Sequence, residues 1–325
     1  MLCLSCPPAA SAAPLPCQRS PALFQLAAHL LAMPAGAMGP DAFDVWSRRL
    51  QILSPGVRLY RAPRASGKGL RAWLRRLKRD SDAPLHCGLA QSKRGRAAVA
   101  VATAATASVA GRVLRFRLAP GFHRPRAVAL TAAGGSAPLP LRRSAAGGYR
   151  LVAEPGWHLR LQVLAEGPQG LRPVLLWRRA PRRSLPWRAA LAAWRQRLRP
   201  TRPGGLADRA APPLRPNRLL TRQAKRHAAR VCALGQARHG DDGRRQGPQS
   251  RLQQSALSAR ALGEVVIKVP HDVSPWREAL LSPSHRATLL DPRFSDVGIG
   301  HSRDGQRRQR CIVVLLAAWP RVQTP

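Results

Sequence analysis

The sequence predicts an α+β protein in which a small, mainly antiparallel β domain precedes a C-terminal domain of helices and strands. Three observations support this fold class. Apolar residues follow the helical i, i+3, i+4, i+7 spacing before residue 80. Between residues 86 and 178, short and partly alternating apolar runs are separated by Gly and Pro turns, which is typical of antiparallel strands. Helical spacing returns after residue 187.

The first helical pattern and the alternating runs define the β-rich domain. Leu70, Trp73, Leu74 and Leu77 share one helical face. Residues 113–118 and 157–164 partly alternate, and turns such as those at 120–121, 134–135 and 147–148 separate such runs. We therefore predict a β-rich domain of unknown function over residues 41–180 with a short helical start. Its histidines are isolated, so we assign it no catalytic residue.

The C-terminal domain, residues 187–319, follows an Arg- and Pro-rich linker. We expect helices over 187–198 and 219–234, and strands over 297–300 and 311–316 around a turn at 304–305. Residues 265–269 are short and β-branched, which predicts either a strand or the end of a loop. Ser282-Pro283 begins a further helix, because Ser is a favoured N-cap and Pro fits the first helical position. Asp291-Pro292 ends that helix.

Local strings in this domain resemble the CAP family, which comprises cysteine-rich secretory proteins, antigen 5 and plant pathogenesis-related proteins. The strongest is Ser282-Pro283-Ser284-His285-Arg286, followed by residues 289–294 and 297–300. Residues 214–217, His239 and Gly263-Glu264 precede it in the family's order, so that the resemblance covers about two-fifths of the chain. It implies a C-terminal α-β-α sandwich with a cavity lined by two histidines and two glutamates.

Carried over by position, the resemblance assigns His239, Glu264 and His285 to that cavity. The second glutamate has no match, although Asp272 or His271 could replace it. The two histidines and one carboxylate could hold a divalent metal such as zinc, because neutral imidazole and carboxylate are zinc ligands. The alternative, which we favour slightly, is that these residues hydrogen-bond one another and brace the fold.

Charge leaves a further interpretation open. The formal net charge is +40, from 55 Lys and Arg against 15 Asp and Glu, and all but five of the basic residues are arginine. Anionic polymers would bind an arginine-rich surface. However, the arginines are spread along the chain, and a GC-rich coding sequence would produce the same profile.

The N-terminal region and the cysteines bear on location. Residues 1–40 are interpreted as a leader or disordered segment, although no basic stretch precedes the apolar run at 23–33. No apolar run reaches the roughly 18–20 residues of a membrane span. The six cysteines are interpreted as separate thiols, with a Cys232–Cys311 bridge left open. We expect a protein that is secreted or located in the cell envelope.

These observations favour an exported, non-enzymatic CAP-domain protein that binds a metal, a small apolar ligand or an envelope component. One alternative is a metal-assisted hydrolase with His239 and His285 as ligands and Glu264 as general base. The other is a polyanion-binding protein whose affinity falls steeply with salt.

Overall fold

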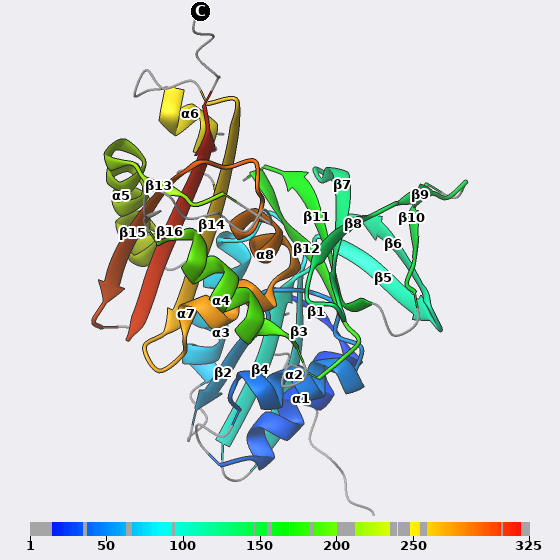
Figure 1. Cartoon of the computed structure of the whole chain (residues 1–325). Helices are drawn as coiled ribbons and strands as arrows, with labels where there is room; N and C mark the ends of the chain where they lie inside the picture. The colour runs from blue at the N-terminus through cyan, green and yellow to red at the C-terminus, as the bar shows by residue number, and fades with distance from the viewer. Residues whose placement is uncertain are drawn as a thin grey trace, which may run out of the picture. The chain divides into compact units, whose positions relative to one another are not determined.

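The computed structural model describes residues 15–34, 38–62, 67–92, 95–145, 147–154, 158–168, 170–181, 185–199, 212–234, 239, 248–253, 259–306 and 308–319. The chain forms two compact units, one of residues 1–42 and 56–104 and the other of residues 43–55 and 105–325. Figure 1 shows the helices and strands with their labels. The unit boundaries differ from the predicted 41–180 domain, because residues 56–104 join the N-terminal segment.

The first unit is a four-stranded sheet in the order β1-β3-β4-β2 with helices on its two faces. Its elements are β1 (Gln18–Arg19), α1 (Pro21–Ala32), β2 (Arg58–Ala62), α3 (Gly67–Arg79), β3 (Leu85–Ser92) and β4 (Gly95–Ala102). The predicted helix around Leu70–Leu77 is confirmed as α3, whose Leu70 and Leu74 pack with Leu85 and Cys87 of β3.

Helix α1 changes the interpretation of residues 1–40. The apolar run that suggested a leader buries Leu23, Leu26, Ala27 and Leu30 in this unit. A Cβ atom added to Gly88 would lie 2.0 Å from the backbone of Leu23, so the helix rests directly on β3. Residues 15–34 are therefore part of a folded unit, because the run is a buried helix face; residues 1–14 lie outside the described residues.

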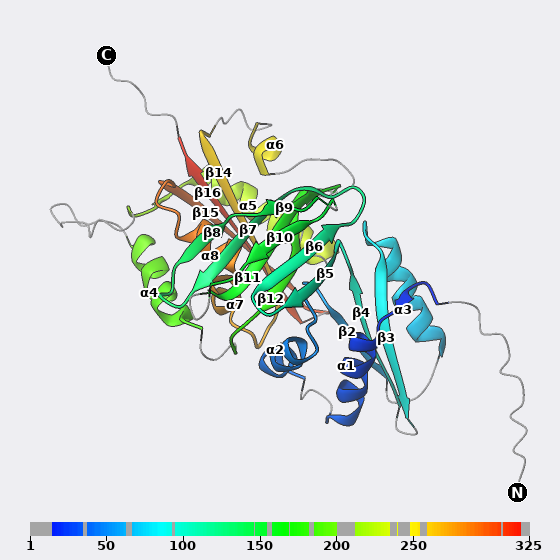
Figure 2. The ribbon, with the colours of Figure 1, turned by 90° about the vertical axis from the view of Figure 1, so that its right-hand side faces the viewer.

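The second unit takes in residues 43–49 of α2 (Pro40–Arg49), with Asp44 among them, and continues with eight strands that form two sheets. One sheet has the order β5-β6-β10-β9 and the other β12-β11-β7-β8 (Figure 2). The strands are β5 (Ala105–Ala110), β6 (Val113–Leu118), β7 (His123–Thr131), β8 (Ser136–Leu139), β9 (Arg142–Arg143), β10 (Tyr149–Val152), β11 (His158–Gly167) and β12 (Gly170–Arg178). All pairings in both sheets are antiparallel, as predicted. Gly134 and Gly147 have φ values of 84° and 78°, which fits glycine at these turns.

The C-terminal part of this unit is a sheet in the order β13-β15-β16-β14. Its elements are α4 (Trp187–Arg197), β13 (Arg215–Pro216), α5 (Arg218–Leu234), α6 (Pro248–Gln253), β14 (Ala261–Pro270), α7 (Pro275–Leu281), α8 (Pro283–Leu289), β15 (Asp296–Asp304) and β16 (Gln309–Ala318). The predicted helices at 187–198, 219–234 and after Ser282 are confirmed as α4, α5 and α8, and the predicted strands as β15 and β16; residues 265–269 lie in a strand, β14.

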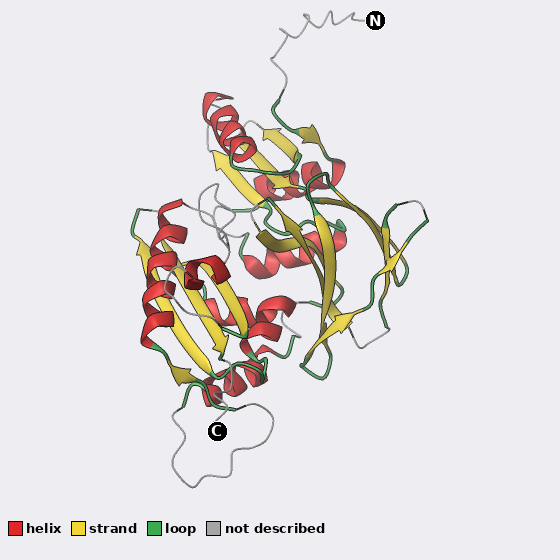
Figure 3. Cartoon of the chain, turned by 90° about the horizontal axis from the view of Figure 1, so that it is seen from above, coloured by secondary structure: helices red, strands yellow, loops and turns green. Residues whose placement is uncertain are grey.

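Alternation along the strands places helices on both faces of this sheet (Figure 3). Ile312 and Val314 of β16 point to one face of the sheet, where they pack with α4, α7 and α8. Val313 points to the other face and packs with α5. Cβ atoms added to Gly298 and Gly300 would lie 2.2 and 2.1 Å from the α5 backbone. The two glycines of the 297–300 string are therefore needed so that α5 can approach β15.

Two disulfides correct the prediction of separate thiols. Cys17 bonds to Cys87 in the first unit, and Cys232 bonds to Cys311 in the second. Cys232 lies on the buried face of α5 and Cys311 on the face of β16 that packs against it. The fold thus closes sequence separations of 70 and 79 residues, which spacing along the chain does not reveal.

No helix among the described residues is long and apolar enough to cross a bilayer.

Candidate functional site

The candidate site is centred on Glu264, near the start of β14. Its side chain is 1% exposed and shares a strand face with Val266, which packs with α5. The preceding residue, Gly263, faces the other way, where an added Cβ would lie 2.8 Å from the Phe294 ring and from Thr288. The Gly-Glu pair thus joins a close packing contact on one face to a buried carboxylate on the other.

Three basic side chains surround this carboxylate. His239 Nδ1 lies 2.8 Å from Glu264 Oε2, and Arg251 of α6 forms an ion pair with Oε1. His227 Nε2, from the buried face of α5, lies 3.8 Å from the same oxygen. Arg251 also donates from NH1 to the carbonyl oxygen of His239 at 2.7 Å. The guanidinium therefore fixes both the carboxylate and the backbone of its histidine partner.

These neighbours determine the ionisation of Glu264. Burial alone would raise the pKa of the carboxyl group. The hydrogen bond with His239 and the charges of His239, Arg251 and His227 oppose that effect, and they lower the pKa below its ordinary value. Glu264 is consequently a stable anion at neutral pH, held inside a basic cage.

His285 is not hydrogen-bonded to Glu264, but it lies within electrostatic reach of His239. It lies in the first turn of α8, which packs with the opposite face of the sheet from α5. Burial, with a smaller contribution from the charge of His239, lowers its pKa to about 4. The ring is therefore neutral at pH 7. His285 makes no hydrogen bond to any described residue. Of the three predicted site residues, the two that the structure brings into contact are His239 and Glu264.

Among the described residues, the Glu264 carboxylate is not placed to ligate a zinc ion. In the described part of the chain, no three His, Cys, Asp or Glu side chains lie together as a metal site. Glu264 Oε1 is instead the counter-ion of Arg251, and a cation placed beside that guanidinium would be repelled. A substrate would have to reach Glu264 for it to act as the general base of a metal-assisted hydrolysis, and its side chain is 1% exposed.

The proposed substitutes for a second glutamate lie elsewhere. Asp272 is exposed in the turn after β14. His271 Nε2 lies 3.0 Å from the Gln309 carbonyl oxygen across the end of the β14–β16 pair. Arg251 is the cluster member that sequence reasoning missed. It belongs to a six-residue helix, and no motif marks it.

The Ser282–Arg286 string has mainly structural contacts. Ser282 is the N-cap residue of α8, but its own side chain makes no capping bond. Gln162 of β11 accepts instead from the Ser284 backbone N–H at 3.0 Å and from the Ser282 hydroxyl at 3.3 Å. Arg286, 2% exposed, donates to the Pro186 carbonyl oxygen at 2.9 Å. The string thus attaches α8 to β11 and to the segment before α4.

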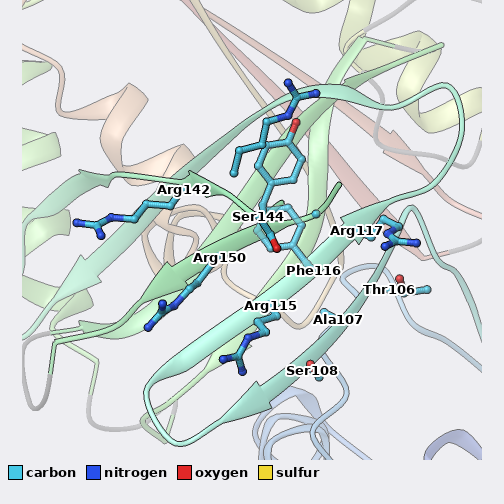
Figure 4. Close-up of a pocket in the computed structure, with 12 residues that line it drawn as sticks. Thr106, Ala107, Ser108, Arg115, Phe116, Arg117, Arg142, Ser144 and Arg150 are labelled. Atoms are coloured by element: carbon cyan, nitrogen blue, oxygen red, sulfur yellow. The ribbon is translucent and has the colours of Figure 1, made fainter. Parts of the chain in front are cut away.

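A basic groove lies on another sheet of the same unit. It has a volume of about 620 Å³ on the sheet formed by β5, β6, β10 and β9. Its basic lining comprises Arg115, Arg117, Arg142, Arg143 and Arg150 (Figure 4). None of these residues was singled out from the sequence, because the arginines are spread so widely along it.

No family model matches the chain, and no curated protein matches it. Three solved structures are similar at low TM-score. An outer surface protein from Borrelia burgdorferi has 20% identity, a TM-score of 0.30, and coverage of 33% of this chain and 78% of its own. An extracellular protein with an SCP domain from Bacillus anthracis has 15% identity, a TM-score of 0.29, and coverage of 66% and 67%. A cysteine-rich secretory protein from Staphylococcus aureus has 9% identity, a TM-score of 0.25, and coverage of 81% and 86%.

Proposed function

We propose that the protein is an exported, non-enzymatic binding protein whose C-terminal domain is a CAP-like α-β-α sandwich. Support for the sandwich comes from the chain itself. The motifs that resemble the family occur in its order, and helices cover both faces of the β13-β15-β16-β14 sheet. Gly263, Gly298 and Gly300 lie where a helix or an aromatic ring leaves no room for a side chain.

The closed cluster around Glu264 is the observation that carries the non-enzymatic part of the proposal. Both carboxylate oxygens are bound by basic groups, and the side chain is 1% exposed. A general base needs a free lone pair within reach of a substrate proton. At 1% exposure the Glu264 side chain is out of reach of a substrate, so we assign it the role of holding His239 and Arg251 against β14.

Export is supported by the two disulfides. Disulfides form and persist in oxidising compartments, such as the cell envelope and the extracellular space. Cys87, Cys232 and Cys311 are buried at 1%, 3% and 0% exposure, so both bonds are integral to the cores of their units.

A zinc titration followed by thermal unfolding tests the proposal. We expect zinc and EDTA to leave the Tm unchanged in the wild type, in His239→Ala and in His301→Ala. His301→Ala is the matched control because His301 is an exposed histidine of β15. A zinc-dependent rise in Tm that persists in His301→Ala and disappears in His239→Ala would overturn the closed-cluster account.

A further inference from the structure

The β5-β6-β10-β9 sheet carries a row of arginines across three neighbouring strands. The register places Arg115 of β6 opposite Arg150 of β10, and Arg150 opposite Arg142 of β9. Directly opposite residues point to the same face of a sheet. Figure 4 shows the three side chains in sequence across the groove. Neighbouring strands lie about 4.8 Å apart, so the backbone attachment points of the three arginines follow one another at about that interval.

This row is electrostatically unfavourable in the protein alone. Like charges directly opposite one another destabilise a sheet. The sequence has no acidic residue between Asp82 and Glu154, so no carboxylate comes from these strands. Arg115, Arg142 and Arg150 are exposed, and they form no ion pair with a described residue. An anion with several charges in line would relieve the repulsion.

The rest of the groove points to a sugar more than to a nucleic-acid base. Thr106, Ser108 and Ser144 contribute hydroxyl groups to its lining. Phe116 and Tyr149, the neighbours of Arg115 and Arg150 along their strands, point to the opposite face of the sheet from the arginine row and stack on each other with centroids 5.3 Å apart. Phe116 is only 4% exposed, and single-stranded nucleic acid binding relies on exposed aromatic rings for base stacking.

We propose that this groove binds a linear anionic glycan through its sulfate or phosphate ester groups. Arg115, Arg150 and Arg142 each pair with an ester group along the polymer. The planar guanidinium donates two parallel hydrogen bonds to an oxyanion, which suits arginine better than lysine for this role. The groove hydroxyls bind the sugar hydroxyls between the charged groups.

This inference deepens the proposed function, on which it rests, by giving the binding protein a ligand class. The groove and the Glu264 cluster share no residue. Failure of glycan binding would leave the outcome of the zinc titration unchanged, and the reverse also holds.

The test is binding of a heparin oligosaccharide at about 150 mM salt, compared between two variants of equal charge. The first is the triple variant Arg115→Gln, Arg142→Gln, Arg150→Gln. The matched control is Arg218→Gln, Arg222→Gln, Arg226→Gln, which removes three exposed arginines that follow one another at i+4 along α5 and line a separate groove.

We expect the groove variant to lose at least about tenfold in affinity, since each charge-assisted hydrogen bond contributes more than a neutral one. The α5 variant should stay within about threefold of the wild type. Arg150→Lys keeps the charge but loses the paired donors, so it should fall between the wild type and the groove variant.

Three results would overturn the proposal. Equal losses in both triple variants would mean that only net charge matters. Equal, groove-dependent affinity for single-stranded DNA of matched charge would assign the groove to nucleic acid. Absence of wild-type binding at this salt would remove the site. The groove variant should keep the wild-type Tm or exceed it, because the substitutions remove repulsion between exposed groups.

Discussion

Gln162 accepts a hydrogen bond from the backbone N–H of Ser284 at 3.0 Å, and thereby caps the helix that the Ser282–Arg286 string begins. Gln162 belongs to β11 and is 5% exposed. The first N–H groups of a helix have no acceptor within the helix. The side chain of the N-cap residue normally accepts a hydrogen bond from one of them. Here a residue 122 positions away supplies the acceptor.

Gln162→Leu should therefore destabilise the second unit by about 1–2 kcal/mol, because it leaves the Ser284 N–H and the Ser282 hydroxyl without their acceptor. Urea unfolding measures the change. Gln196→Leu is the control, since Gln196 is exposed on α4 and should stay within about 0.5 kcal/mol of the wild type. Equal unfolding midpoints for the two variants would show that the cap contributes nothing.

Helix and strand positions were largely predictable because they depend on local periodicity. The buried face of the predicted helix at 219–234, α5, comprises residues at helical spacing: Leu220, Ala224, His227, Ala228, Val231 and Cys232. Contacts between residues that are far apart in the sequence could not be predicted. Asp44 forms buried ion pairs with Arg160 and Arg178, more than one hundred positions away, and nothing near Asp44 in the sequence indicates its partners.

The candidate site divides in the same way. The order of the family-like motifs predicted His239 and Glu264 as site residues, and the structure places them in contact. Arg251 could not be predicted, because any of the 50 arginines could equally have been the partner of Glu264. His227, on the buried face of α5, also faces the Glu264 carboxylate.

Stability should fall between about pH 6.5 and pH 4 through His285. Its folded pKa is lowered to about 4 by burial and by the charge of His239, whereas an unfolded histidine titrates near pH 6.5. Between these values the unfolded chain binds the proton and the folded chain does not. The contribution of His285 is thus fully present above about pH 6.5 and is lost as pH falls towards 4.

Unfolding free energies from pH 7 to pH 4.5 measure this effect. The wild type should lose stability more steeply than His285→Gln, by up to about 1.4 kcal/mol per pH unit. His123→Gln is the control, since the His123 side chain is 62% exposed. Parallel pH profiles for the wild type and His285→Gln would contradict the buried, neutral state.

The Cys232–Cys311 disulfide should contribute about 2–5 kcal/mol to the stability of the second unit. The measurement compares the wild type with the double variant Cys232→Ala, Cys311→Ala under non-reducing conditions. Added dithiothreitol should lower the wild-type Tm and leave that of the variant less affected. If mass spectrometry finds Cys232 and Cys311 alkylated in unreduced protein from an oxidising compartment, the pairing is wrong.

The central claim is that Glu264 braces the C-terminal domain as the counter-ion of Arg251, and a double-mutant cycle tests it most directly. Glu264→Gln leaves a buried guanidinium without its counter-ion and should cost about 3–5 kcal/mol. Glu166→Gln, in a more exposed set of ion pairs, should cost no more than about 1 kcal/mol.

The double variant Glu264→Gln, Arg251→Gln should be more stable than the sum of the single losses predicts, with a coupling energy above about 1 kcal/mol. Such coupling would establish the brace. Additive losses, or a Glu264→Gln variant as stable as the wild type, would contradict it.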